Sequence, residues 1–73
     1  MITEEMWQKA YQHIQEESFF AFIYYDEKTK KQSREFWANR DPLLLRYYQG
    51  ERTEQLYQQM TELKAEWLKN TQN

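Results

Sequence analysis

The stretch over residues 19–25 constrains the fold of this 73-residue chain more than any other, because it forms an unbroken apolar and aromatic run, FFAFIYY, within a polar sequence. Phe, Tyr and Ile lose side-chain freedom on a helix and pack well on a pleated surface, so the composition of the run predicts a β-strand. Periodicity over so short a run does not separate a buried strand from a buried helix, and the segment that follows must decide.

That segment, residues 26–31 (DEKTKK), has no apolar side chain and begins with Asp26, a residue type that starts turns by hydrogen bonding to nearby backbone. The pattern predicts a β-hairpin whose return strand covers residues 31–37, with charged side chains that suit a sheet edge. The alternative is a helix over about residues 30–39. Both faces of such a first strand would be apolar, so helices of the chain would cover one and a further helix or another molecule the other.

Helix signals flank this central region. Thr3 is a good N-cap for a helix over residues 4–17 with one apolar face: Met6, Trp7, Ala10 and Ile14. Asp41 followed by Pro42 predicts the start of a short helix over residues 42–49, with no helix running through Asp41, because the residue before proline avoids helical geometry. Gly50 occupies the position of a C-terminal helix glycine. A long helix from residue 51 or 53 to residue 69 is predicted by an apolar stripe: Leu56, Met60, Leu63 and Trp67.

Together these segments predict one small α+β domain over residues 1–73, in the order helix, β-hairpin, short helix, long helix. The alternative is an all-α helical bundle in which residues 19–39 are helical. A core of this size supplies little net stability, and small chains often compensate by oligomerisation.

The residue inventory disfavours catalysis. The chain has no cysteine, one histidine and one glycine, which excludes thiolate sites, multi-histidine metal sites within one chain and glycine-rich phosphate loops. His13 has Glu16 and Glu17 at i+3 and i+4, which suits either a general base or an ordinary helical ion pair. We favour the ion pair because no nucleophile motif accompanies the histidine. We expect a chain that is not an enzyme, with no catalytic residue, cofactor, metal or small-molecule substrate.

Charge and hydropathy narrow the remaining function classes. The net charge of −2 disfavours nonspecific binding to nucleic acid. One basic cluster supports the alternative of a nucleic-acid-associated accessory protein that uses the hairpin turn: Lys28, Lys30, Lys31 and Arg34. A solvated turn is the simpler interpretation of that cluster. No apolar segment reaches the length of a membrane span and the N-terminus lacks the basic start of a signal peptide, so we predict a cytoplasmic protein.

Aromatic residues are the most informative part of the composition. Three Trp, six Tyr and four Phe exceed what a core of this size easily buries, and Tyr and Trp are frequent interface anchors. We therefore predict a noncatalytic protein-interaction module, a possible regulator or inhibitor, that forms a homodimer or binds a larger protein. The predicted interface residues are Trp7, Tyr11, Tyr24, Trp37, Tyr47, Tyr48 and Tyr57.

Overall fold

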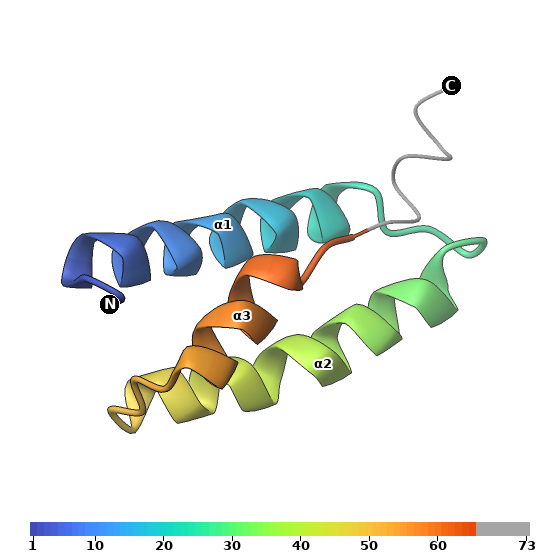
Figure 1. Cartoon of the computed structure of the whole chain (residues 1–73). Helices are drawn as coiled ribbons and strands as arrows, with labels where there is room; N and C mark the ends of the chain where they lie inside the picture. The colour runs from blue at the N-terminus through green and yellow to red at the C-terminus, as the bar shows by residue number, and fades with distance from the viewer. Residues whose placement is uncertain (66–73) are drawn as a thin grey trace.

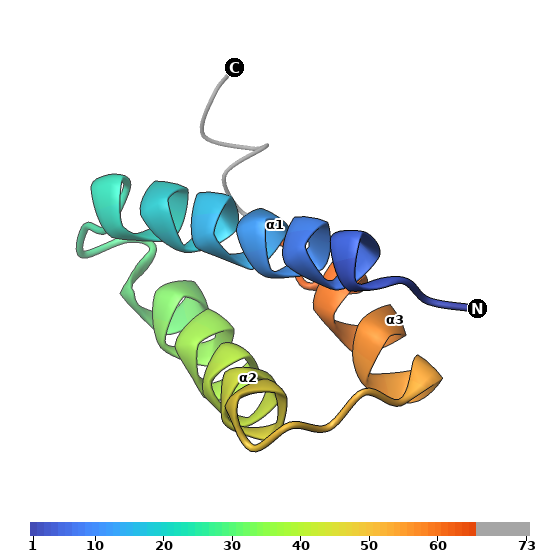
Figure 2. The same ribbon diagram turned by 90° about the vertical axis from the view of Figure 1, so that its left-hand side faces the viewer.

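The structure is a computed structural model that describes residues 1–65, and over that range the chain forms three helices and no strand. They are α1 (Glu4–Ile23), α2 (Lys30–Tyr48) and α3 (Glu54–Glu62). A turn joins α1 to α2, and α3 packs against both (Figure 1 and Figure 2). The predicted α+β fold is therefore wrong, and the alternative of an all-α helical bundle is confirmed.

Residues 19–23 of the aromatic run belong to α1 and not to a strand, and Tyr24 and Tyr25 follow the helix. The acidic residues before it are good helix formers, and the Ser18 hydroxyl donates to the Ile14 carbonyl at 2.7 Å, so the predicted break between helix and strand does not occur. Once a helix is formed, each added residue contributes a hydrogen bond, and Ala21 extends the buried stripe of α1. The strand preference of Phe and Tyr depends on a pleated partner, and residues 31–37 lie in α2 instead.

The turn after α1 is held by Asp26 and Thr29. The Asp26 carboxylate accepts a hydrogen bond from the backbone N–H of Thr29 at 2.9 Å, and the Asp26 N–H donates to the Thr29 hydroxyl at 3.1 Å. This reciprocal pair resembles a capping box, and the bond from the Thr29 N–H lowers the pKa of Asp26. Asp26 therefore starts a turn as predicted, but the turn connects two helices.

Helix α2 runs through Pro42, so the predicted helix start at this residue is wrong. Proline removes one helical hydrogen bond and crowds the carbonyl of Ala38, four residues earlier. Ala38 lies on the exposed side of α2. Buried side chains on both sides of the proline, Phe36 before it and Leu43 and Leu44 after it, keep α2 in one piece by tertiary packing.

The connection from α2 to α3 follows the sequence prediction. Gly50 has a φ of +98°, a conformation that favours glycine. Its N–H donates to the carbonyl of Tyr47, and the N–H of Glu51 donates to the carbonyl of Arg46, both at 3.0 Å. These two bonds form a Schellman motif, which confirms Gly50 as the helix C-terminal glycine. Thr53 then caps α3 with its side chain.

Helix α3 ends at Glu62, earlier than the predicted residue 69, and residues 66–69 lie outside the described range. Nε2 of His13 donates to the Leu63 carbonyl at 2.8 Å, and the Glu17 carboxylate accepts from the N–H of Ala65 at 3.0 Å. Two side chains of α1 thus bind the backbone just after α3. His13 has this structural contact in place of the predicted ion pair.

Two groups of buried residues hold the helices together. The main cluster joins all three helices and contains Trp7, Ala10, Ile14, Leu43, Leu44, Leu56 and Met60. The second cluster lies toward the turn between α1 and α2 and contains Ala21, Phe36 and Ala65. Leu63 packs against both clusters. The apolar stripes predicted for the first and last helices are therefore confirmed for Trp7, Ala10, Ile14, Leu56, Met60 and Leu63, whereas Met6 is half-buried and belongs to neither cluster.

Candidate protein-interaction surface

The C-terminal end of α1 and the turn after it expose six large apolar or aromatic side chains. Phe22 and Phe19 expose 75% and 60% of their surface, and the other four expose 42–49%. We call this set the α1 aromatic surface: Phe19, Phe20, Phe22, Ile23, Tyr24 and Tyr25. Monomeric proteins rarely expose large contiguous apolar patches, and those that do generally bind something there.

The α1 aromatic surface follows from helical geometry. At 3.6 residues per turn, Phe19 and Ile23 lie on the side of α1 opposite the buried residues Ile14 and Ala21. Glu16 and Gln12 lie on this same outer side, about one and two turns before Phe19. The outer side of α1 therefore changes from polar to aromatic at residue 19. Extending the helical pattern past residue 17 would have revealed this change in the sequence.

The exposed rings border two separate hollows. Phe19 meets Phe20 edge to face with ring centres 6.0 Å apart, and Phe20 stacks with Tyr24 at 6.5 Å. One open hollow lies beside these rings and is lined by Gln12, Gln15, Glu16, Phe19 and Phe20. A second, more apolar hollow is lined by Phe22, Tyr25 and Trp37. The α1 aromatic surface therefore offers an apolar contact area, and polar side chains lie along one of its borders.

Of the seven predicted interface residues, five gather in an aromatic layer at the other end of the molecule: Trp7, Tyr11, Tyr47, Tyr48 and Tyr57. Trp7 meets Tyr57 edge to face at 5.4 Å, and Tyr11 stacks on Tyr47 at 5.4 Å. Trp7 exposes only 3% of its surface and belongs to the main core cluster. Tyr48 is the most exposed member of the layer, at 64%. These aromatic side chains contact one another, and Trp7 is not available to a partner.

Tyr11 and Tyr48 form a polar edge to that layer. Their hydroxyl oxygens lie 2.7 Å apart, and the Gln15 side-chain amide donates to the Tyr11 hydroxyl at 2.6 Å. The hydrogen bond with Tyr11 raises the pKa of the Tyr48 hydroxyl. The contact between the two hydroxyls holds α1 against α2.

The other two predicted interface residues lie near the α1 aromatic surface. Tyr24 is part of it, and half-buried Trp37 lines its second hollow. The Trp37 indole N–H donates to the Ser33 hydroxyl at 3.0 Å, and the Arg40 guanidinium lies 4.7 Å from the ring centre. These two contacts hold the Trp37 ring in place along one side of the second hollow.

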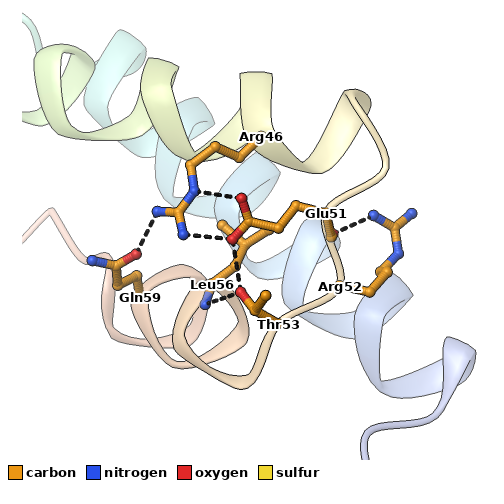
Figure 3. A network of polar contacts seen from close by, with 6 residues as sticks. All are labelled: Arg46, Glu51, Arg52, Thr53, Leu56 and Gln59. Carbon is orange, nitrogen blue, oxygen red and sulfur yellow. Dashed lines mark hydrogen bonds and ion pairs between the residues drawn. The ribbon is translucent and has the colours of Figure 1, made fainter.

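An ion-pair network stabilises the turn between α2 and α3 (Figure 3). Arg46 binds the Glu51 carboxylate through two nitrogens, at 2.9 and 2.5 Å, and donates to the Gln59 side chain at 2.8 Å. The Thr53 hydroxyl donates to the same carboxylate at 2.7 Å. Arg46 and then Thr53 lower the pKa of Glu51 to about 2. Arg52, beside this network, places its guanidinium 4.1 Å from the centre of the Tyr47 ring.

We expect Glu51→Gln to lower the melting temperature most at pH values above about 4.5 and least near pH 2. The pKa of Glu51 is depressed on folding, so the stabilisation from its charged form is complete above the unfolded pKa and is lost as pH falls through the folded value. Melting temperatures of the wild type and variant between pH 2 and 7 measure this difference. A difference that stays constant with pH would contradict the expectation.

The predicted basic cluster lies in the turn between α1 and α2 and at the start of α2. Lys28, Lys31 and Arg34 are exposed, and Lys30 is half-buried. The first turn of α2 has no acidic residue, so the positive end of the helix dipole adds to this positive charge. Asp26 and Glu27 offset part of the charge within the same turn.

Other kinds of site find little support in residues 1–65. No three His, Cys, Asp or Glu side chains in this range gather closely enough to hold a metal ion. None of the described helices is long and apolar enough to cross a membrane. Comparison with family models, with curated proteins and with solved structures finds no match.

Proposed function

We propose that this chain is a noncatalytic protein-interaction module that binds a protein through the α1 aromatic surface. The supporting observation is that six neighbouring apolar or aromatic side chains expose 42–75% of their surface at one end of α1. Residues 19–25 do not form the predicted strand with two apolar faces, so the proposal depends on the exposed face of α1 instead.

The surface has the composition of a binding site. Phe and Tyr rings are rigid, and burying each of them in a contact removes a large apolar area from water. The neighbouring glutamines and Glu16 supply a polar border, as in the rims of protein interfaces. Such a module suits a regulator or inhibitor that acts by occupying a partner's surface, and a cytoplasmic location remains a prediction from the sequence.

A protein partner is better supported than a nucleic acid. Binding to nucleic acid depends mainly on positive charge, and the basic cluster shares its turn with Asp26 and Glu27 in a chain of net charge −2. The exposed rings are mostly phenylalanines that lie beside an acidic and amide-rich helix face. An association that depends only weakly on salt is therefore expected, and one that weakens steeply with salt would favour nucleic acid.

The proposal is tested by placing the photo-crosslinking amino acid p-benzoylphenylalanine at position 22 in the full chain in cells. We expect a covalent adduct with a polypeptide, because Phe22 is the most exposed member of the α1 aromatic surface. The matched control is the same replacement at Leu45, which is 58% exposed but lies on α2 outside this surface. Equal adducts from both positions, or none from position 22, would contradict the proposal.

A further inference from the structure

We propose that the partner of the α1 aromatic surface is a second copy of this chain, with the two α1 helices antiparallel across a two-fold axis near residues 19–22. This inference rests on the proposed function and names its partner. In a two-fold dimer the same patch faces itself, so one surface must supply every complementary group.

The exposed area is adequate for such a dimer. The six side chains of the α1 aromatic surface expose 42–75% of their area, which at about 200 Å² per side chain amounts to at most roughly 600 Å² per copy. Two copies would remove at most about 1,200 Å² from water, the lower end of the range for specific interfaces. The polar border adds further contact. We therefore expect a dimer that dissociates in the micromolar range and is held mainly by apolar contact.

The charges around the patch favour the antiparallel arrangement. With a rise of 1.5 Å per residue and a centre near residues 19–22, Glu16 of one copy lies level with about residue 25 of the other, next to its turn. The turn and the start of α2 carry four basic side chains (Lys28, Lys30, Lys31 and Arg34) and three acidic ones (Asp26, Glu27 and Glu35), so their net charge is +1. Exposed Glu16 would thus face a net positive group. Parallel helices would bring the two positive turns together instead.

Sedimentation velocity of the full chain between about 1 µM and 1 mM tests the dimer. We expect a concentration-dependent shift from monomer to dimer for the wild type. Phe22→Glu should weaken dimerisation by at least about 100-fold, because the two-fold axis introduces the buried charge twice. Leu45→Glu is the matched control and should dimerise as the wild type does. Circular dichroism should show the same helix content in all three, since both substituted residues are exposed.

A charge exchange tests the orientation. Glu16→Lys should weaken the dimer, and adding Lys28→Glu to the same chain should restore part of the loss. Failure of the second change to restore association would overturn the antiparallel arrangement.

The dimer and the proposed function can fail separately. A wild-type chain that remains monomeric at about 1 mM overturns the dimer. If position 22 then still forms an adduct with a different polypeptide, the proposed function stands with another partner.

Discussion

Replacing Trp7 by alanine should lower the free energy of unfolding by about 3–5 kcal/mol, as is usual when a buried Trp or Phe is removed from a core. Trp7 exposes 3% of its surface and packs in the main cluster with residues from α2 and α3. Its ring also meets Tyr47 and Tyr57, and the Arg52 guanidinium lies 5.4 Å from the ring centre. A core of this size rarely supplies more than about 3–5 kcal/mol, so we expect the variant to be mostly unfolded.

Urea denaturation followed by far-UV circular dichroism measures this effect. Trp7→Phe keeps an aromatic ring in the cluster and should lose much less stability. Leu45→Ala is the surface control, because Leu45 is 58% exposed, and it should change stability by no more than about 0.5 kcal/mol. A cooperative Trp7→Ala protein with nearly wild-type stability would show that Trp7 is not part of the core.

Replacing Phe36 by alanine should lower the free energy of unfolding by about 3 kcal/mol or more. Phe36 exposes 3% of its surface and forms the second cluster with Ala21 and Ala65, which are both small. Its ring is therefore the largest side chain buried in that cluster, and neighbouring alanines cannot fill the space it leaves. The loss of stability should be greatest at the end of the bundle where the α1 aromatic surface lies.

The matched control is Phe22→Ala, which removes the same side chain from a position that is 75% exposed. It should leave the stability of the monomer within about 0.5 kcal/mol of the wild type. Hydrogen exchange gives the location: amides of residues 18–23 and 33–37 should lose more protection in Phe36→Ala than those of residues 7–14. Equal stability losses from the two Phe substitutions would contradict the assignment of Phe36 to the core and Phe22 to the surface.

The sequence indicates that aromatic side chains are exposed, but it does not indicate which ones. The excess of aromatic residues correctly indicates that some remain exposed, because a chain this short cannot enclose thirteen of them. Yet Trp7, a predicted interface residue, is buried, while Phe19 and Phe22 were assigned to covered strand faces and are exposed. Composition records how many rings there are, whereas the conformation of residues 19–25 determines where they point.

The sequence by itself determined the features that depend on neighbours within a few residues. Thr3 and Thr53 cap helices with their side chains, and Gly50 ends α2 in the conformation that glycine tolerates best. The stripes of α1 and α3 also follow from periodicity alone. These features are local because a cap or a turn forms its hydrogen bonds within about one helical turn.

Only the tertiary structure decided whether the helices continue past ambiguous residues. The aromatic run is helical through Ile23 because Ala21 meets Phe36 and Ala65 from distant parts of the chain. Helix α2 passes Pro42 because its two halves pack against α1 and α3. Strand preference and a proline each disfavour helix by a limited local energy. Burial of side chains against residues far away in the sequence outweighs that energy, and no local pattern records it.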